Sequence, residues 1–157
     1  MTDADVVQHF YSAFDRRDGD AMAACYAPDA HFRDPVFGDL TGAEAGAMWR
    51  MLTSRAEDLS VELVEHDART AHWIARYTFT QTGRPVVNDV RAEFTIADGL
   101  IAEHIDQFSF WKWSRQALGR SGLLLGWTPQ LRAKVSHQAR RGLELQMRRE
   151  ARSASAS

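Results

Sequence analysis

The chain has 157 residues, of which 45% are hydrophobic and 25% are charged, and its formal net charge is -2. These values are typical of one globular domain and exclude disordered, fibrous and collagen-like chains. The single cysteine, Cys25, excludes an intramolecular disulfide and a thiolate metal cluster.

The first third of the chain predicts helices. Residues 4–17 place a set of apolar side chains at helical spacing: Val6, Val7, Phe10, Tyr11 and Phe14. A second, short helix is expected to run through Met22 and Tyr26 and to end at Pro28. A third helix is expected to begin at Thr41.

Extended segments lie between and after these helices. Residues 30–38 predict an extended stretch that turns at Pro35, because a residue before proline, here Asp34, avoids the helical region. Four stretches with alternating polarity then follow: 59–66, 70–81, 86–97 and 100–111. Asp98-Gly99 between the last two is a strong hairpin signal. Helices followed by a meander of antiparallel strands indicate an α+β fold.

The alternation within the strands predicts which side chains face the core. The inward set of 70–81 is Trp73, Ala75, Tyr77 and Phe79, and that of 86–97 is Val90, Ala92, Phe94 and Ile96. The inward set of 100–111 is Leu100, Ala102, His104, Asp106, Phe108 and Phe110. Because an ionised carboxylate in an apolar interior is unfavourable unless paired, Asp106 either has a partner or a function. The alternatives are a self-satisfied pair with His104 or an arginine, and an acid/base site.

The last 46 positions, 112–157, differ in character from the rest. A short helix is expected over 112–118, followed by an apolar link with three glycines that ends at Trp127. Thr128-Pro129 predicts the start of a helix to about Arg149. That helix carries a narrow apolar stripe: Leu131, Val135, Ala139, Leu143 and Met147. Ser153 to Ser157 are expected to fray.

The charge divides the chain at the same point. Residues 112–157 contain ten Lys/Arg and two acids, a net of +8, whereas residues 1–111 contain nine Lys/Arg and nineteen acids, a net of -10. We therefore expect a pocket domain over 1–111 and a helical extension over 112–157. The apolar link is expected to cover the pocket mouth or a neighbouring subunit, and the basic helix to lie on the acidic body.

The beginning of the chain and its apolar runs bear on location. The N-terminus is acidic and has no apolar stretch, so no signal peptide is expected. The longest apolar run, Leu123–Leu125, is far too short to span a membrane. We therefore expect a cytoplasmic protein with no membrane partner. The acidic body argues against nucleic acid as a partner.

Five segments carry a resemblance to a known family: 6–11, 26–30, Asp34-Pro35-Val36, 61–63 and 104–108. Over about the first 110 residues the chain resembles the nuclear transport factor 2-like superfamily, in its ketosteroid isomerase and polyketide cyclase (SnoaL-like) branch. The resemblance implies a cone-shaped, curved antiparallel sheet packed on the N-terminal helices around an apolar pocket. It also implies a homodimer that uses the outer face of the sheet, with Ile74, Ile105 and Trp111.

The resemblance also implies roles for single residues. Asp34 stands at the place of the general base of the steroid isomerases. Their two oxyanion donors fall on Phe10 and Ala92, which cannot donate a hydrogen bond, so a reaction other than steroid isomerisation is expected. Asp106 resembles the late-strand Asp that epoxide hydrolases and cyclases of this superfamily use. The Arg-x-Asp of those hydrolases has its nearest counterpart in Arg76-Tyr77-Thr78, and Tyr77 faces inward.

The sequence thus predicts an acid/base enzyme without cofactor or metal, of the isomerase, cyclase or hydratase/epoxide hydrolase type, that acts on a small, mostly apolar substrate. The expected catalytic residues are Asp34, Asp106, His104 and Tyr77. The expected substrate-binding residues are Phe10, Tyr11, Phe14, Phe37, Trp49, Trp73, Ala92 and Phe108. The alternative is a non-catalytic small-molecule-binding or dimeric interaction module. Carboxyl groups that line one cavity would favour the enzyme.

Overall fold

A computed structural model describes residues 1–156. Helices α1 (Asp3–Asp15) and α2 (Gly19–Ala24) come first, followed by the hairpin of β1 (Tyr26–Asp34) and β2 (Gly38–Thr41). Helix α3 (Gly42–Arg55) precedes the meander of β3 (Ser60–His66), β4 (Thr70–Phe79), β5 (Arg84–Ala97) and β6 (Leu100–Gln107). Three helices end the chain: α4 (Phe110–Leu118), α5 (Arg120–Leu125) and α6 (Pro129–Ala156).

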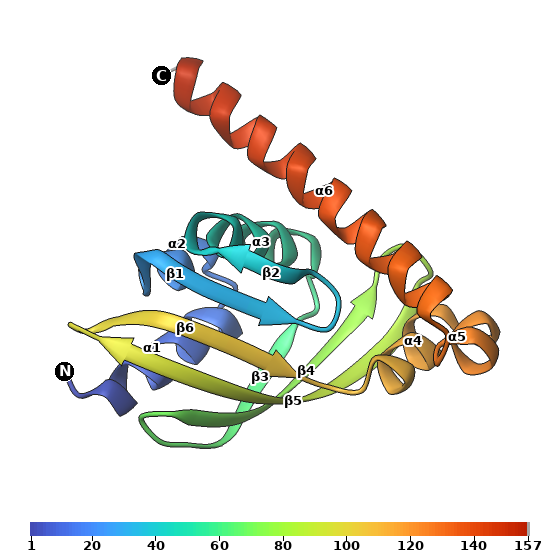
Figure 1. Ribbon diagram of the computed structural model, residues 1–157, viewed down its shortest axis with the longest axis horizontal. Coiled ribbons are helices and arrows are strands. Elements are labelled where there is room, and N and C mark those ends of the chain that lie inside the picture. Colours follow the sequence, from blue (N-terminus) through green and yellow to red (C-terminus); the bar gives the residue numbers. More distant parts are fainter. Residues whose placement is uncertain (157) are drawn as a thin grey trace.

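The strands form one sheet in the order β2-β1-β6-β5-β4-β3. All neighbours are antiparallel except β1 and β6, which run parallel. The sheet curls without closing, and α1 and α3 pack against its inner face (Figure 1). The α+β cone-like fold predicted from the sequence is confirmed.

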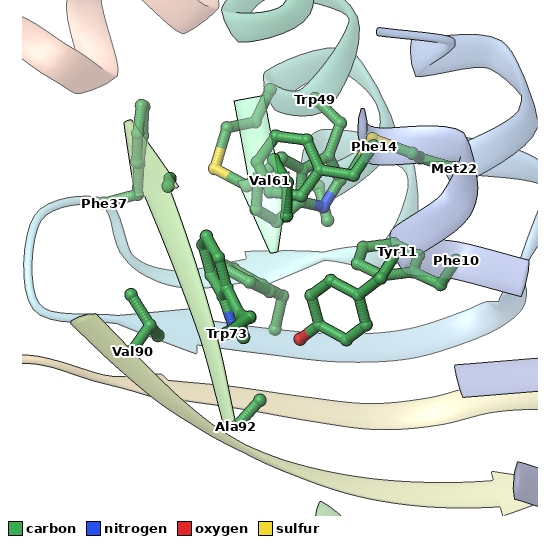
Figure 2. Packing of buried hydrophobic residues seen from close by; sticks show 14 of the residues in the cluster. Phe10, Tyr11, Phe14, Met22, Phe37, Trp49, Val61, Trp73, Val90 and Ala92 are labelled. Atoms are coloured by element: carbon green, nitrogen blue, oxygen red, sulfur yellow. The ribbon is translucent and has the colours of Figure 1, made fainter. Parts of the chain in front are cut away.

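Local signals explain where the helices around the sheet begin. The side chains of Thr2 and Thr41 each accept a hydrogen bond from the backbone N–H three residues later, and the carboxylates of Asp5 and Glu44 accept from the backbone N–H of Thr2 and Thr41. These reciprocal capping boxes fix the starts of α1 and α3. The core between the helices and the sheet is rich in aromatic side chains, including Phe10, Phe14, Trp49 and Trp73 (Figure 2).

The second helix ends earlier than the sequence predicts. It stops at Ala24, and Tyr26 is the first residue of β1. The N–H of Ile101 donates to the Cys25 carbonyl at 2.8 Å, which starts the parallel pairing of β1 with β6. Because Pro28 also disfavours a helix through this stretch, the expected helical position of Tyr26 is wrong.

The fourth strand of the meander departs from the prediction at both ends. Thr95 pairs with Glu103 and Ile96 with Ile101, so one residue bulges and the alternation changes phase. Ile101 is fully buried, whereas Ala102 is half-buried, and the inward prediction for Ala102 is wrong. At the other end the Ser109 hydroxyl accepts from Lys112 N–H and caps α4, so β6 ends at Gln107.

The C-terminal extension is helical almost throughout. The link with three glycines contains α5, and α6 continues to Ala156, so residues 153–156 are helical where fraying was expected; Ser157 lies outside the described residues. The predicted stripe on α6 is confirmed: Leu143 is buried, and its companions are half-buried. Figure 1 shows α6 running from the tip formed by α4 and α5 back past α3.

Polar contacts fasten α6 to the body. Two nitrogens of Arg50 donate to the two oxygens of Glu150 at 2.9 and 2.8 Å, and Arg140 donates to the Asp39 carbonyl at 2.8 Å. Within residues 1–156 the Arg50–Glu150 pair is the ion pair that joins α6 to the body. In this pair the acidic residue belongs to the extension and the basic residue to the body, which is the opposite of what the net charges of these two parts predict. None of the described helices is both long and apolar enough to cross a membrane.

Candidate functional site

A cavity of about 230 Å³ lies between the inner face of the sheet, α3 and the C-terminal helices. Its apolar lining includes Phe14, Phe37, Trp49, Trp73, Phe79, Phe108, Trp113, Leu118, Val135 and Ala139. Helices α4 and α6 thus complete the cavity. The apolar link does not cover it as expected, since Leu124 and Trp127 are 66% and 75% exposed.

Asp34 ends β1 and its carboxyl group lines the cavity. Its Oδ1 accepts the backbone N–H of Val36 at 2.9 Å and of Phe37 at 2.6 Å, as in an Asx turn around Pro35. This arrangement leaves Oδ2 for the cavity. Burial raises the pKa of Asp34 to about 6, the charge of Asp106 acts in the same direction, and the two backbone N–H groups oppose the rise.

Asp106 also lines the cavity, and it ends a buried chain of hydrogen bonds. Trp49 Nε1 donates to the Tyr26 hydroxyl at 2.8 Å, and this hydroxyl lies 2.8 Å from His104 Nδ1. His104 Nε2 in turn lies 2.9 Å from Asp106 Oδ1. His104 is fully buried and Asp106 is 4% exposed. The carboxyl group is therefore held in one orientation by a chain that begins on α3.

The donors and acceptors of this hydrogen-bonded series are compatible with one consistent direction of donation. Trp49 can only donate, so the Tyr26 oxygen accepts from it and the Tyr26 proton is free to point to His104 Nδ1. With Nδ1 as an acceptor, the neutral imidazole carries its proton on Nε2 and donates it to Asp106. In this arrangement His104 orients Asp106 through its Nε2–H.

Tyr77 supplies a hydroxyl group to the same cavity from β4. Its oxygen accepts from Trp113 Nε1 at 2.9 Å, which leaves its proton available as a donor. Burial raises the pKa of Tyr77, and the negative charge of Asp34 raises it further. The phenol therefore stays protonated at neutral pH and acts as a donor close to Asp34.

Two buried polar atoms have no hydrogen-bond partner among residues 1–156: the Tyr11 hydroxyl and Trp73 Nε1. The two rings are neighbours, with centroids 5.6 Å apart, and Figure 2 shows the Tyr11 hydroxyl directed toward the indole. Trp73 lines the cavity and Tyr11 lies behind it. Unpartnered buried groups of this kind are uncommon and suit a polar atom of a ligand or a water molecule.

The structure brings most of the predicted site residues together. Asp34, Asp106 and Tyr77 line one cavity, together with Phe14, Phe37, Trp49, Trp73 and Phe108. His104 reaches this cavity only through Asp106. Phe10, Tyr11 and Ala92 belong to the core rather than to the lining. Ala92 pairs with Asp106 across the sheet, and the ring of Phe10 meets that of His104 edge-on.

Several residues of the site were not foreseen. The sequence predicts a helix through Tyr26, although the proline two residues later marks a non-helical segment. Trp113 was not recognised as the donor to Tyr77, because its position on α4 does not show which strand it meets. Asn88 from β5 adds a polar group to the lining. Periodicity on α6 indicated an inward stripe but not that it would face a cavity.

Other chemistries find little support in the described residues. Within 1–156 no three His, Cys, Asp or Glu side chains are grouped so that they could hold a metal ion. Cys25 is buried, and burial raises the pKa of its thiol to about 11, so the reactive thiolate is scarce. The polar groups that line the cavity are carboxyl, hydroxyl and amide groups and the guanidinium of Arg55.

A family model described as a SnoaL-like domain matches residues 7–104, more than half of the chain. The chain belongs to the SnoaL-like family. No curated protein sequence matches this SnoaL-like chain. The resemblance inferred from its sequence motifs is thus confirmed at the level of the family.

Solved structures show the same fold for this SnoaL-like chain. A protein with a ketosteroid isomerase-like fold from Catenulispora acidiphila, in complex with trimethylamine, has a TM-score of 0.61 at 17% identity and covers 71% of this chain and 91% of its own. A putative polyketide cyclase from Xanthomonas campestris has a TM-score of 0.58 at 23% identity, with coverages of 73% and 96%. An LEH-like epoxide hydrolase from M. tuberculosis has a TM-score of 0.61 at 19% identity, with coverages of 78% and 92%.

Proposed function

We propose that the protein is a cofactor-independent acid/base enzyme that transfers a proton on a small, mostly apolar substrate held in the cavity. One observation carries this proposal: Asp34 and Asp106, from different strands, line the same apolar cavity in different settings. Asp34 accepts hydrogen bonds from two backbone N–H groups, whereas Asp106 is oriented by a hydrogen bond to His104. Carboxyl groups kept in distinct environments are a recurring basis for acid/base catalysis.

Each polar group has a role in this proposal. Asp34 is the general base, because a pKa of about 6 leaves it mostly ionised at neutral pH and still a useful proton acceptor. Tyr77 donates a hydrogen bond to the substrate oxygen on which negative charge develops. Asp106, fixed by His104, accepts from a substrate hydroxyl group or from water. Asp34 then returns its proton to another atom of the substrate, which suits isomerisation, cyclisation or hydration.

A second candidate function rests on the buried chain of hydrogen bonds that runs from Trp49 to Asp106. The link from Trp49 to Asp106 satisfies the inward polar groups internally, as a non-catalytic binding module would require. In that case the cavity holds a small apolar molecule without changing it. The two functions differ in whether Asp34 removes a proton from a bound molecule, and this difference can be measured directly.

The base is tested with a nitrobenzisoxazole, a small apolar molecule that reports any carboxylate base in an apolar site. The base removes the ring C–H proton while the N–O bond breaks, and a coloured cyanophenolate is released. We expect catalysis whose rate rises with pH around a midpoint of about 6, following the ionisation of Asp34. Asp34→Asn should lower the rate by roughly 100-fold or more, because general-base catalysis contributes that much.

A matched control separates this effect from a general change in charge. Asp29→Asn removes a carboxylate from an exposed position of the same strand and should leave the rate unchanged. Binding of the probe without turnover, or turnover that persists in Asp34→Asn, would exclude Asp34 as the base. The first of these results would favour the binding module.

The proposal includes the assembly and location expected from the sequence: a homodimer in the cytoplasm. Ile74 and Ile105 lie on the outer face of the sheet and are half-buried in the single chain. A second copy packed on this face would cover the exposed part of both. Sedimentation equilibrium distinguishes a mass of two chains from a mass of one.

A further inference from the structure

An apolar tip projects from the end of the molecule that α4 and α5 form. We define the apolar tip as Leu123, Leu124, Leu125 and Trp127, whose exposed fractions are 49%, 66%, 51% and 75%. Figure 1 shows α5 at one extremity, away from the N-terminus. Adjacent large apolar side chains left in water mark an interaction surface more often than scattered single ones do.

The apolar tip is anchored through its backbone while its side chains face solvent. Trp111 Nε1 donates to the Leu123 carbonyl at 3.2 Å, and Thr128 N–H donates to the Leu125 carbonyl at 2.9 Å. Gly122 is packed so tightly on the Ser114 carbonyl that a Cβ at this position would overlap it. The exposure of these side chains therefore follows from an ordered backbone.

The stretches of chain on both sides of the apolar tip are basic. The stretch 107–143 contains no acid and seven basic residues: Lys112, Arg115, Arg120, Arg132, Lys134, Arg140 and Arg141. None of the seven lies within ion-pair distance of a carboxylate in the part of the chain that the structure describes. Arg115 and Arg132 instead lie over the rings of Trp111 and Phe110, at 4.9 and 5.7 Å from the ring centres.

We propose that the apolar tip and its basic surround bind the surface of an anionic membrane. Leucine and tryptophan side chains partition into the boundary between headgroups and acyl chains, while lysine and arginine attract anionic headgroups. The combination of both features at one extremity suits this partner. It revises the sequence-based expectation of no membrane partner, because the exposure of these side chains cannot be read from the sequence.

A second copy of the chain fits the same surface less well. In a symmetric contact between two tips, the unpaired basic residues would face one another and repel. An asymmetric contact requires an apolar patch elsewhere, yet the other exposed large hydrophobic residues within 1–156 are dispersed: Met1, Val64, Val87 and Leu145. Such a contact would also propagate into open chains rather than close.

The location of the apolar tip ties it to the cavity. Trp113 and Leu118 from α4 and Val135 from α6 line the cavity, and these two helices flank α5. A membrane bound at the tip would thus lie beside the helices that complete the cavity. Apolar molecules are concentrated in such a membrane. The membrane proposal does not depend on whether the cavity is catalytic.

Flotation with lipid vesicles tests the proposal on the full chain. We expect binding to vesicles of phosphatidylcholine mixed with phosphatidylglycerol, and much weaker binding to phosphatidylcholine alone or in high salt. The double substitution Leu124→Glu with Trp127→Ser should lower the partition coefficient by at least about tenfold. Val64→Glu, which alters an exposed aliphatic residue on β3, should leave it unchanged.

The electrostatic part is tested with Arg120→Gln and Lys134→Gln, each expected to lower binding to anionic vesicles roughly fivefold. Arg69→Gln, an exposed arginine on the body, is the matched control. Equal binding to neutral and anionic vesicles, or no binding to either, would overturn the proposal. So would a fall in assembly size for the Leu124→Glu, Trp127→Ser protein in light scattering, because that result would assign the tip to a second copy.

Discussion

At the scale of single residues, Asp34 makes the stability of the fold depend on pH. Its pKa rises from 3.8 to about 6 on folding, chiefly because it is buried. Between these values the native state binds more protons than the unfolded state, so stability falls as pH rises through this window. Above about pH 6 the free energy of unfolding is lowered by the full amount, which is at most about 3 kcal/mol.

Asp34→Asn should therefore raise the free energy of unfolding by about 1–3 kcal/mol near pH 8 and change it little near pH 4. The amide keeps an oxygen that accepts from Val36 and Phe37 but carries no charge. Urea denaturation at both pH values measures the difference. A gain of the same size at both would show that the charge of Asp34 is not responsible.

Two buried tyrosines allow a matched comparison of paired and unpaired hydroxyl groups. The Tyr26 hydroxyl bonds to Trp49 and His104, whereas the Tyr11 hydroxyl has no partner within 1–156. Tyr26→Phe should lower the free energy of unfolding by about 1–3 kcal/mol, because it leaves buried partners unsatisfied. Tyr11→Phe should be neutral or stabilising by up to about 1 kcal/mol. Equal losses for both in denaturant titrations would contradict this assignment.

At the scale of elements, α6 is held to the body by a narrow contact. Leu143 is its one fully buried residue, 3% exposed, while Leu145 on the other side of the helix is 43% exposed. Because its apolar stripe is so narrow, the docking of α6 on the body depends strongly on each buried side chain. Because α6 also lines the cavity, its attachment determines whether the cavity is covered.

Leu143→Ala should lower the free energy of unfolding by about 2–3 kcal/mol, since truncation of a buried leucine leaves a cavity. Leu145→Ala removes the same atoms from an exposed position and should change it by less than about 0.5 kcal/mol. Thermal and chemical denaturation compare the two variants. If Leu143→Ala were as mild as Leu145→Ala, α6 would not be docked on the body in solution.

The inner faces of β4 and β5 could be predicted because their alternation is unbroken, as the buried Trp73 and Val90 show. Prediction failed at Ala102 because the bulge in β6 depends on how two strands pair, which periodicity does not encode. Asp34 could be predicted from the Asp34-Pro35-Val36 motif, and Asp106 from the strand face on which the alternation places it. Tyr26 and Trp113 were missed because their partners lie 78 and 36 residues away along the chain.

At the scale of the whole molecule, charge and apolar surface are segregated. The outer face of the sheet carries cross-strand pairs such as His72–Asp89 at 2.7 Å and Arg76–Glu62 at 3.3 Å. Five basic residues of the extension, Lys112, Arg115, Arg120, Arg132 and Lys134, lie in the chain close to the apolar tip. The molecule is therefore electrically polar, and an anionic surface would both attract it and orient it, with the tip foremost.

The placement of the tryptophans gives the protein an intrinsic optical reporter. Trp49, Trp73 and Trp113 line the cavity, whereas Trp127 is 75% exposed at the tip. A molecule that enters the cavity changes the polarity around three indoles, while a lipid surface changes that around a fourth. Trp111, the remaining tryptophan, bonds to Leu123 at the tip. In a Trp111→Phe, Trp127→Phe background the three tryptophans left all line the cavity, so ligands can be found by fluorescence without any label.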